Sequence, residues 1–308
     1  MADAEAIESF DCFGGRVTVI VMGDGAAGTP QQAVAMVKRR MLAWHRQFSR
    51  FDHSSELAVL NADLRPTVAV SPVMARLIDA IVDAAQSSGG LVDATLVDEI
   101  ETAGYIEHFD RVPVPLRRAL ELAPSRAPGG PSPEARWRQV TLDRRARAVT
   151  RAPGIRFDSG GIAKGLFGDI LATVLETHAS FAIDCSGDVR LGGREKIERP
   201  VLVESPFEAI TLHTFSLSAG AVATSGIGRR SWLGPDGRPA HHLLDPASGR
   251  PAFTGLVQVT AIAPSGVEAE WRAKAALLSG PDAAAGWLPH GGIAVADDGS
   301  FCPIEAER

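Results

Sequence analysis

The sequence of 308 residues has few cysteines, no excess of positive charge and no long apolar run. Its three cysteines, Cys12, Cys185 and Cys302, are odd in number and widely spaced, so neither a disulfide framework nor a CxxC motif is indicated. We therefore expect free thiols in a reducing compartment. The net charge of −6 argues against an extended basic face, and we expect no nucleic-acid or anionic-membrane partner.

Targeting and membrane signals are also lacking. The N-terminal stretch MADAEAIESFDCFGG is acidic and has no basic region followed by an apolar run, so no signal peptide is expected. No window approaches the roughly 18 apolar residues of a membrane span. These features predict a cytoplasmic protein without a membrane span.

What the chain does contain is ordinary globular composition, with 45% apolar and 22% charged residues. Its length is long for one core, so either one large domain or two fused lobes is expected. We treat residues 1–308 as a single domain. The stretch 110–136, which includes the Pro- and Gly-rich APSRAPGGPSP, is the candidate for an insertion or a lobe boundary.

Apolar periodicity predicts a mixture of strands and helices that does not follow a βαβ rhythm. Several strands follow one another directly, which indicates an α+β fold with largely antiparallel sheets rather than a doubly wound parallel sheet. Helices are expected at 31–48, 73–86, 163–178 and 266–278. Strands are expected at 16–22, 181–185, 200–204, 210–217, 257–263 and 292–296, with a hairpin inside 137–157.

The strongest chemical signal is FDSGGIAKGLFGDILATVLE, residues 157–176. Gly160 and Gly161 would let the backbone approach a ligand, and the helix that follows presents free N–H groups. Lys164 lies in the first turn, where a cation opposes the helix dipole, and this placement hints at a bound phosphate. The stretch matches neither GxxxxGK[ST] nor GxGxxG. A Gly-rich helix start with a solvated lysine explains the same residues.

Four further stretches are weaker when each is taken alone. Residues 181–193 resemble an ordinary hairpin turn. Residues 217–232 are mostly small and favour a flexible loop, although Thr224 and Ser225 could donate to a phosphate. In HHLLDPASGRP, a structural role for His242 is favoured. In APSGVEAEWRAKAALLSGP, Glu270 and Lys274 fit a surface ion pair of a helix that begins with a Ser265 capping box.

Together, the order and spacing of these stretches resemble the FAD:protein FMN transferase family, also called the ApbE family. The resemblance begins near CFGGRV and continues through FSRFDHSSELAVLN, SSGGLVDATL, DSGGIAKG, SGDVRLGG, AVATSG, HHLLDPASG and APSGVEAE. It implies a two-lobed α+β fold with a flavin-nucleotide groove. The implied reaction cleaves FAD, attaches FMN through a phosphoester to a Thr or Ser of an acceptor flavoprotein, and releases AMP.

The resemblance also implies roles for individual residues. His242 would assist proton transfer at the attacking hydroxyl. Mg²⁺ would be held by the carbonyl of Gly161 and by an Asp–Thr pair, which this chain replaces with Glu270 and Lys274. The residues expected to contact FAD are Phe13, Phe51, Leu91, Val92, Asp93, Asp158, Lys164 and Leu244, and Thr224 is added as a phosphate donor.

The replaced pair changes the expected chemistry, because an ammonium cannot ligate a metal and Mg²⁺ tolerates little displacement of a carboxylate. The simplest outcome is that Lys274 takes the place of the metal, beside Glu270 and facing the pyrophosphate. Lys274 thus becomes a candidate catalytic residue. Three functions stay open: transfer of FMN, hydrolysis of FAD to FMN and AMP, and binding of FAD without chemistry.

Overall fold

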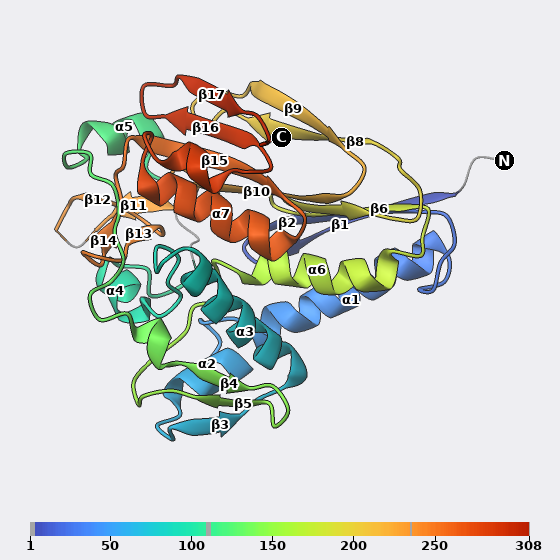
Figure 1. Cartoon of the computed structure of the whole chain (residues 1–308), viewed down its shortest axis with the longest axis horizontal. Coiled ribbons are helices and arrows are strands. Elements are labelled where there is room, and N and C mark those ends of the chain that lie inside the picture. Colours follow the sequence, from blue (N-terminus) through green and yellow to red (C-terminus); the bar gives the residue numbers. More distant parts are fainter. Residues whose placement is uncertain (1–3, 109–111, 235, 308) are drawn as a thin grey trace.

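The computed structural model describes residues 4–108, 112–234 and 236–307. Its centre is a sheet in the order β1-β2-β6-β7-β10-β15-β16-β17, in which every neighbouring pair is antiparallel (Figure 1). The expected α+β class with antiparallel sheets is therefore confirmed. The strands are Glu5–Cys12, Gly15–Met22, Ser180–Cys185, Asp188–Gly192, Gly220–Gly226, Leu256–Ala263, Gly292–Ala296 and Phe301–Ile304.

Three helices pack against the strands of this sheet: α1 (Pro30–Gln47), α6 (Ala163–Leu175) and α7 (Gly266–Ser279). Alternation along the strands explains the layering, since successive side chains point to opposite faces. Val17, Val19 and Val21 of β2 belong to the core formed with the helices. Ile20 packs instead into a second cluster with residues of β8 (Arg199–Glu204) and β9 (Thr211–Leu217).

Smaller elements complete the structure. The hairpin β8–β9 (Arg199–Glu204, Thr211–Leu217) packs beside the main sheet, and a three-stranded sheet, β3-β5-β4, lies at the far end of the molecule (Figure 1). The remaining helices are α2 (Glu56–Ala62), α3 (Pro72–Ser87), α4 (Val97–Thr102), α5 (Leu116–Glu121), η1 (Arg136–Gln139) and η2 (Ala284–Trp287). The remaining strands are β3 (Thr67–Ala69), β4 (Thr141–Asp143), β5 (Ala148–Thr150), β11 (Ser231–Leu233), β12 (Pro239–His241), β13 (Leu244–Asp245) and β14 (Arg250–Pro251).

Helix ends follow the local sequence. The hydroxyls of Ser71 and Ser265 accept hydrogen bonds from the backbone N–H groups of Met74 and Glu268, so both serines cap their helices. Of the capping box predicted at Ser265 only this half forms among the described residues, because the Glu268 carboxylate accepts from Arg272 instead. Gly280, with φ of 79°, ends α7 in a conformation that suits glycine. The expected hairpin within 137–157 is also present, as β4 paired with β5.

The prediction of a flexible loop at 217–232 is wrong. This stretch contains β10, a central strand that pairs with both β7 and β15. Its small side chains are explained by the close approach of α7, because Ala221 and Ala223 pack against Ala269 of that helix. Small residues here allow helix and sheet to come close, and they do not indicate mobility.

A GxGxxG pattern does occur at Gly23, Gly25 and Gly28, between β2 and α1. It is not a Rossmann fingerprint, because β2 pairs only with antiparallel neighbours among the described strands. Gly25 and Gly28 form a bridge to each other. A Cβ placed on Gly25 would lie 2.6 Å from the ring of His178, so protein fills the space that a pyrophosphate would need.

The region 110–136 contains α5 and an extended connection to η1. Residues 110 and 111 lie outside the described residues, and a lobe boundary or insertion here stays a prediction. Within the described part of the chain, no helix combines the length and the apolar character needed to cross a bilayer.

Candidate active site

One cavity lies where α6 begins, between the β1–β2 turn, the segments that follow α1 and α3, and the turn at 242–246. Lys274 and Leu278 of α7 contribute to another wall. Residues far apart in the sequence therefore meet around one space. A concave site with apolar walls and a few convergent polar groups is the usual form of a small-molecule site.

Most of the residues predicted to bind or react line this cavity. They are Phe13, Phe51, Leu91, Val92, Asp93, Asp158, Gly161, Lys164, His242, Leu244 and Lys274. Thr224 and Glu270 are not among the described residues that line it. Thr224 lies on β10, where its hydroxyl is 2.9 Å from that of Thr260 and its N–H donates to Asp188. Its role as a phosphate donor stays a prediction.

Lys164 projects from the first turn of α6, and its ammonium forms an ion pair with the carboxylate of Asp188. A cation at a helix N-terminus calls for a nearby anion, and here the protein supplies one. The placement of Lys164 therefore does not by itself require a phosphate. Burial opposes its charge, but Asp188 and Glu270 outweigh this effect and raise the pKa of Lys164 above its ordinary value.

Glu270 is buried rather than on the surface, at 1% exposure. One carboxylate oxygen accepts a hydrogen bond from the N–H of Gly165 at 2.9 Å, and the other lies 3.4 Å from the ammonium of Lys274. The sequence-based interpretation as a surface ion pair is therefore wrong. A Cβ placed on Gly161 would lie 3.2 Å from Cε of Lys274, so the lysine lies directly against the glycine turn.

These contacts do not fit a magnesium site at Gly161 and Glu270. The carboxylate already serves a helix N-terminus and an ammonium, and an ammonium has no lone pair to offer a metal. Among the described residues, no group of three or more His, Cys, Asp and Glu side chains is arranged to hold a metal ion. The arrangement instead gives a cationic site formed by Lys274.

His242 and its neighbour His241 lie in different environments. His242 lines the cavity, and its Nδ1 is buried without a hydrogen-bond partner in the described part of the chain. Burial, followed by the charges of Arg230, His241 and Lys274, lowers the pKa of His242 well below its ordinary value. The ring is therefore neutral at neutral pH and able to accept a proton. His241 is 2% exposed and packs against Phe253 at 4.9 Å between ring centroids.

Aromatic side chains form much of the wall near the β1–β2 turn. Phe13 has φ of 55° in this two-residue turn, and its ring stacks on Phe167 at 5.4 Å. The N–H of Phe13 donates to Nδ1 of His45 at 3.3 Å. Phe51 contacts Tyr105 at 5.4 Å. Such faces suit the flat rings of a nucleotide.

Sequence reasoning missed two arginines that line the cavity. Arg230 donates to the carbonyl of Phe13 at 3.2 Å. Arg50, whose side chain is 7% exposed, lies over the ring of Phe51 and contacts Asp158 at 3.5 Å. The only signal for Arg50 was its place between Ser49 and Phe51 in FSRF, and Arg230 stood out only as part of a small basic pair.

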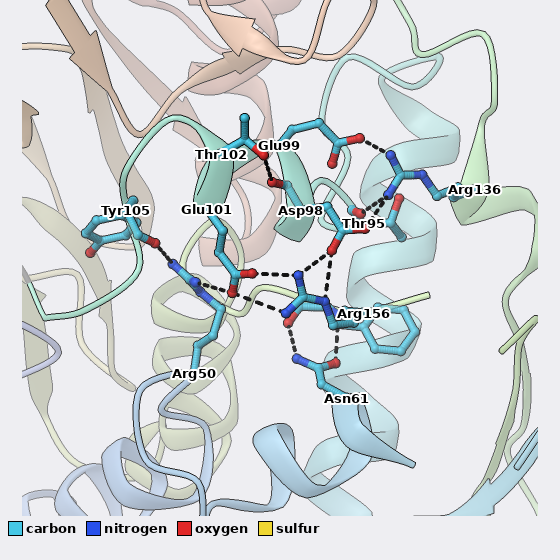
Figure 2. Close-up of polar contacts among 11 residues, drawn as sticks. Arg50, Asn61, Thr95, Asp98, Glu99, Glu101, Thr102, Tyr105, Arg136 and Arg156 are labelled. Carbon is cyan, nitrogen blue, oxygen red and sulfur yellow. Dashed lines mark hydrogen bonds and ion pairs between the residues drawn. The ribbon is translucent and has the colours of Figure 1, made fainter. Parts of the chain in front are cut away.

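An ion-pair network connects Arg50 to α4, the short helix beside the cavity (Figure 2). Each of three arginines from separate segments reaches a carboxylate on α4. These ion pairs hold α4 against the segments that carry the arginines. Its arginines are Arg50, Arg136 and Arg156, and its acids are Asp98, Glu99 and Glu101.

Asp93 shows an unmet hydrogen-bonding capacity. Its Oδ1 accepts from the N–H and the hydroxyl of Thr95, at 2.8 and 2.6 Å, whereas Oδ2 is buried and has no such partner among the described residues. Burial is the main reason why the pKa of Asp93 is raised. A ligand N–H or O–H could donate to the open oxygen.

Fold and cavity define an α+β protein with a cavity that combines aromatic faces, four cationic side chains and a neutral histidine, a composition suited to a phosphorylated aromatic ligand. The chain belongs to the ApbE family, whose sequence model matches residues 13–296.

Two relatives illustrate the similarity. An FAD:protein FMN transferase from Treponema pallidum is 30% identical over 73% of this chain, and the match spans 65% of that protein. An FAD:protein FMN transferase from Klebsiella pneumoniae is 25% identical over 91% of this chain and 79% of its own length. The chain thus spans slightly less than two thirds of the Treponema relative.

Solved structures agree with the fold. The ApbE protein from Thermotoga maritima superposes with a TM-score of 0.79 at 24% identity, covering 98% of this chain and 97% of that one. The flavinyl transferase ApbE from Pseudomonas stutzeri gives a TM-score of 0.77 at 21% identity, with coverage of 99% and 96%.

Proposed function

We propose that this protein binds FAD and transfers its FMN half to a Thr or Ser hydroxyl of an acceptor flavoprotein, releasing AMP. The observation that carries the proposal is the meeting of a neutral His242 with Lys274, Lys164 and Arg230 around one aromatic-walled cavity. The names of the two relatives support the same activity.

The reaction exchanges the phosphoanhydride bond of FAD for a phosphoester bond to the acceptor. The acceptor hydroxyl oxygen attacks the phosphorus on the FMN side of the pyrophosphate, and the bond from that phosphorus to the bridging oxygen breaks. AMP leaves with the bridging oxygen, and the hydroxyl proton passes to His242. Arg230 and Lys274 lower the basicity of this ring in the empty cavity. A bound pyrophosphate would offset both charges and make His242 a stronger base.

Neutralisation of the negative charge on the pyrophosphate of FAD is assigned to side chains of the protein. The ammonium of Lys274 lies beside the Gly161 turn with 13% of its side chain exposed, so it can face a phosphate without full hydration. Cations fixed in such a site stabilise charge that develops in the transition state. We therefore propose transfer that does not require Mg²⁺.

Recognition of the two ring systems is assigned to the cavity walls. Phe13 and Phe51 offer aromatic faces, and Leu91, Val92 and Leu244 offer apolar contacts. Because each half of FAD would have its own contacts, FAD should bind more tightly than FMN.

Binding of FAD without transfer is the second candidate function. The observation that favours it is the ammonium of Lys274, which lies beside Glu270 at the position where the resemblance implied an oxygen ligand for a metal. Without a divalent ion, the cavity would keep its contacts to the nucleotide but would lose part of the charge that stabilises the transition state.

The protein is also proposed to act in the cytoplasm. Its cysteines are unpaired, and two of them, Cys12 and Cys185, are buried. Burial raises the pKa of the Cys12 thiol to about 12 and raises the pKa of the Cys185 thiol well above its ordinary value, so neither thiol is a reactive thiolate at neutral pH.

The decisive experiment incubates pure protein with FAD and an acceptor domain, with Mg²⁺ or with a chelator, and follows AMP and acceptor mass. An acceptor mass gain equal to FMN, with one AMP per transfer, supports the proposal. AMP without acceptor labelling indicates hydrolysis, and no AMP indicates binding only. Calorimetry with FAD and FMN measures recognition separately, and equal affinities would contradict the assignment of two ring sites.

A further inference from the structure

Asp188 is a buried acid that the proposed reaction does not use directly. It begins β7, after the two-residue turn Ser186–Gly187, and is 8% exposed. It does not line the cavity in the described structure, yet its carboxylate is paired with Lys164, which does. A buried acid paired with a lysine of the cavity wall can determine both the position and the charge of that lysine.

The position of the Asp188 carboxylate is fixed by the sheet. The last pair between β7 and β10 is Val189 with Val222, and Asp188 lies one residue beyond it. Its Oδ1 then accepts the N–H of Thr224 on β10 at 3.0 Å, which leaves Oδ2 for Lys164. Because both sides of the carboxylate are occupied, the ammonium is held at a defined point of the wall.

Lys164 keeps donors for a ligand. An ammonium has three N–H groups, and Asp188 is the one acceptor that its Nζ reaches within the described residues. The side chain remains 22% exposed, which leaves it open toward the cavity. The other donors can therefore reach a phosphate oxygen.

The surroundings of Lys164 show why Asp188 is important for keeping its ammonium charged. Burial favours the neutral amine, and the positive charge of Arg230 acts in the same direction. Asp188 is the strongest opposing charge, followed by Glu270 of α7. On β6, the carboxyl of Asp184 and the thiol of Cys185 also lie within electrostatic reach. Removing Asp188 would leave the ammonium of Lys164 largely shielded from water, near the positive charge of Arg230, with only Glu270 of the described residues as a strong opposing charge.

We propose that Asp188 is a positioning residue that fixes the ammonium of Lys164 at the cavity wall and keeps it protonated for the diphosphate of FAD, an inference that rests on the proposed function. Asp188→Asn is the suitable change, because its amide oxygen can still accept the N–H of Thr224. Asp184→Asn is the matched control, since Asp184 accepts the N–H of Gly187 in the same hairpin but has no ion pair with Lys164.

Lysine side-chain NMR tests the charge directly. The chain has only four lysines, Lys38, Lys164, Lys196 and Lys274, so Lys164→Arg assigns its signal. The pKa of Lys164 should fall in Asp188→Asn and change much less in Asp184→Asn. An unchanged pKa in Asp188→Asn would overturn the proposal. This measurement needs no FAD, so it decides the proposal even if the protein proves not to bind flavin.

FAD affinity against pH tests the consequence. In Asp188→Asn, the Kd should rise by up to about tenfold per pH unit above the lowered pKa, whereas the native protein keeps its affinity over that range. Asp188→Asn combined with Lys164→Arg should lose this pH dependence, because a guanidinium stays charged. If Asp188→Asn and native protein show the same pH profile, the proposal is wrong. Failure of the native protein to bind FAD would instead contradict the proposed function.

Discussion

Glu270 of α7 accepts a hydrogen bond from the N–H of Gly165 at the start of α6, while Asp169 of α6 accepts from the N–H of Gly266 at the start of α7. Each helix thus satisfies the free amide of the other, at distances of 2.9 and 2.8 Å. The crossing is so close that a Cβ on Gly165 would lie 2.4 Å from the backbone of Gly266. Glu270 is therefore a structural acid that also neutralises Lys274.

Replacing Glu270 should destabilise the fold. Glu270→Ala leaves a buried N–H without an acceptor and Lys274 without its acid, so we expect a loss of about 1–3 kcal/mol in the free energy of unfolding. Urea denaturation measures it. Glu268→Ala on the same helix removes a partly exposed pair with Arg272 and should cost well below 1 kcal/mol. Equal effects of the two changes would contradict the capping role.

Lys274 should act in place of a divalent ion. Removing Mg²⁺ with a chelator is expected to leave transfer by the native protein unchanged, because the ammonium beside Gly161 supplies the positive charge. Lys274→Ala should weaken FAD binding about tenfold or more, measured by fluorescence quenching. Lys38→Ala, which removes a lysine paired with Glu8 on another part of the surface, is the control. A strict requirement for Mg²⁺ in the native protein would show this assignment to be wrong.

The two adjacent histidines should differ in their effects. His242→Ala is expected to lower transfer by about 10²–10⁴-fold with FAD affinity nearly intact, because it removes a general base. His241→Ala should instead lower stability, since His241 is buried against Phe253 outside the cavity. Transfer rates and thermal unfolding separate the two. Loss of folding and binding together in His242→Ala would support a structural role.

Much of the fold followed from local patterns. Helix 266–278 was readable because Ser265 and Gly280 mark its ends, and strand 16–22 because of its β-branched residues. The strand at 220–226 was not predicted from the sequence. Its alanines allow the close approach of α7, a helix that is distant in sequence. Tertiary contact, rather than propensity, determines this strand.

The same distinction between local patterns and tertiary contacts applies to the residues of the site. Positions such as His242 and Lys274 followed from motif order, and they do meet at one cavity. Arg230 and Asp188 contact partners far along the chain, namely Phe13 and Lys164, and no local sequence pattern predicts such pairs. Glu270 looked like half of a surface pair because periodicity cannot show that α6 covers it.

Acid should destabilise the protein partly through His241. Burial lowers its pKa from 6.5 to about 4, so between these values the unfolded chain binds the proton more readily than the folded one. Stability from this residue is therefore complete above pH 6.5 and is lost as the pH falls toward 4, by about 3 kcal/mol in total. Urea denaturation at several pH values measures it. His241→Gln should lose less stability over this range, and an identical pH dependence would contradict the assignment.

Phe13 should prove to be a residue kept for binding rather than for stability. A two-residue turn with positive φ at both positions favours Asn-Gly, yet this chain has Phe13, at φ of 55°, before Gly14, at φ of 71°. Strain of this kind tends to occur at functional sites. In Phe13→Asn, relief of strain, roughly 1 kcal/mol, should offset part of the lost packing against Phe167, so stability changes little.

The same change should raise the Kd for FAD about tenfold or more, because an aromatic face of the cavity disappears. Ser186→Asn is the control, since Ser186 has φ of 60° in the corresponding turn between β6 and β7 but does not line the cavity among the described residues. It should leave FAD affinity unaltered. Thermal unfolding and fluorescence quenching of both variants decide the matter. If Phe13→Asn lowered stability by several kcal/mol and left affinity unchanged, Phe13 would be a packing residue, and the strained turn would need another explanation.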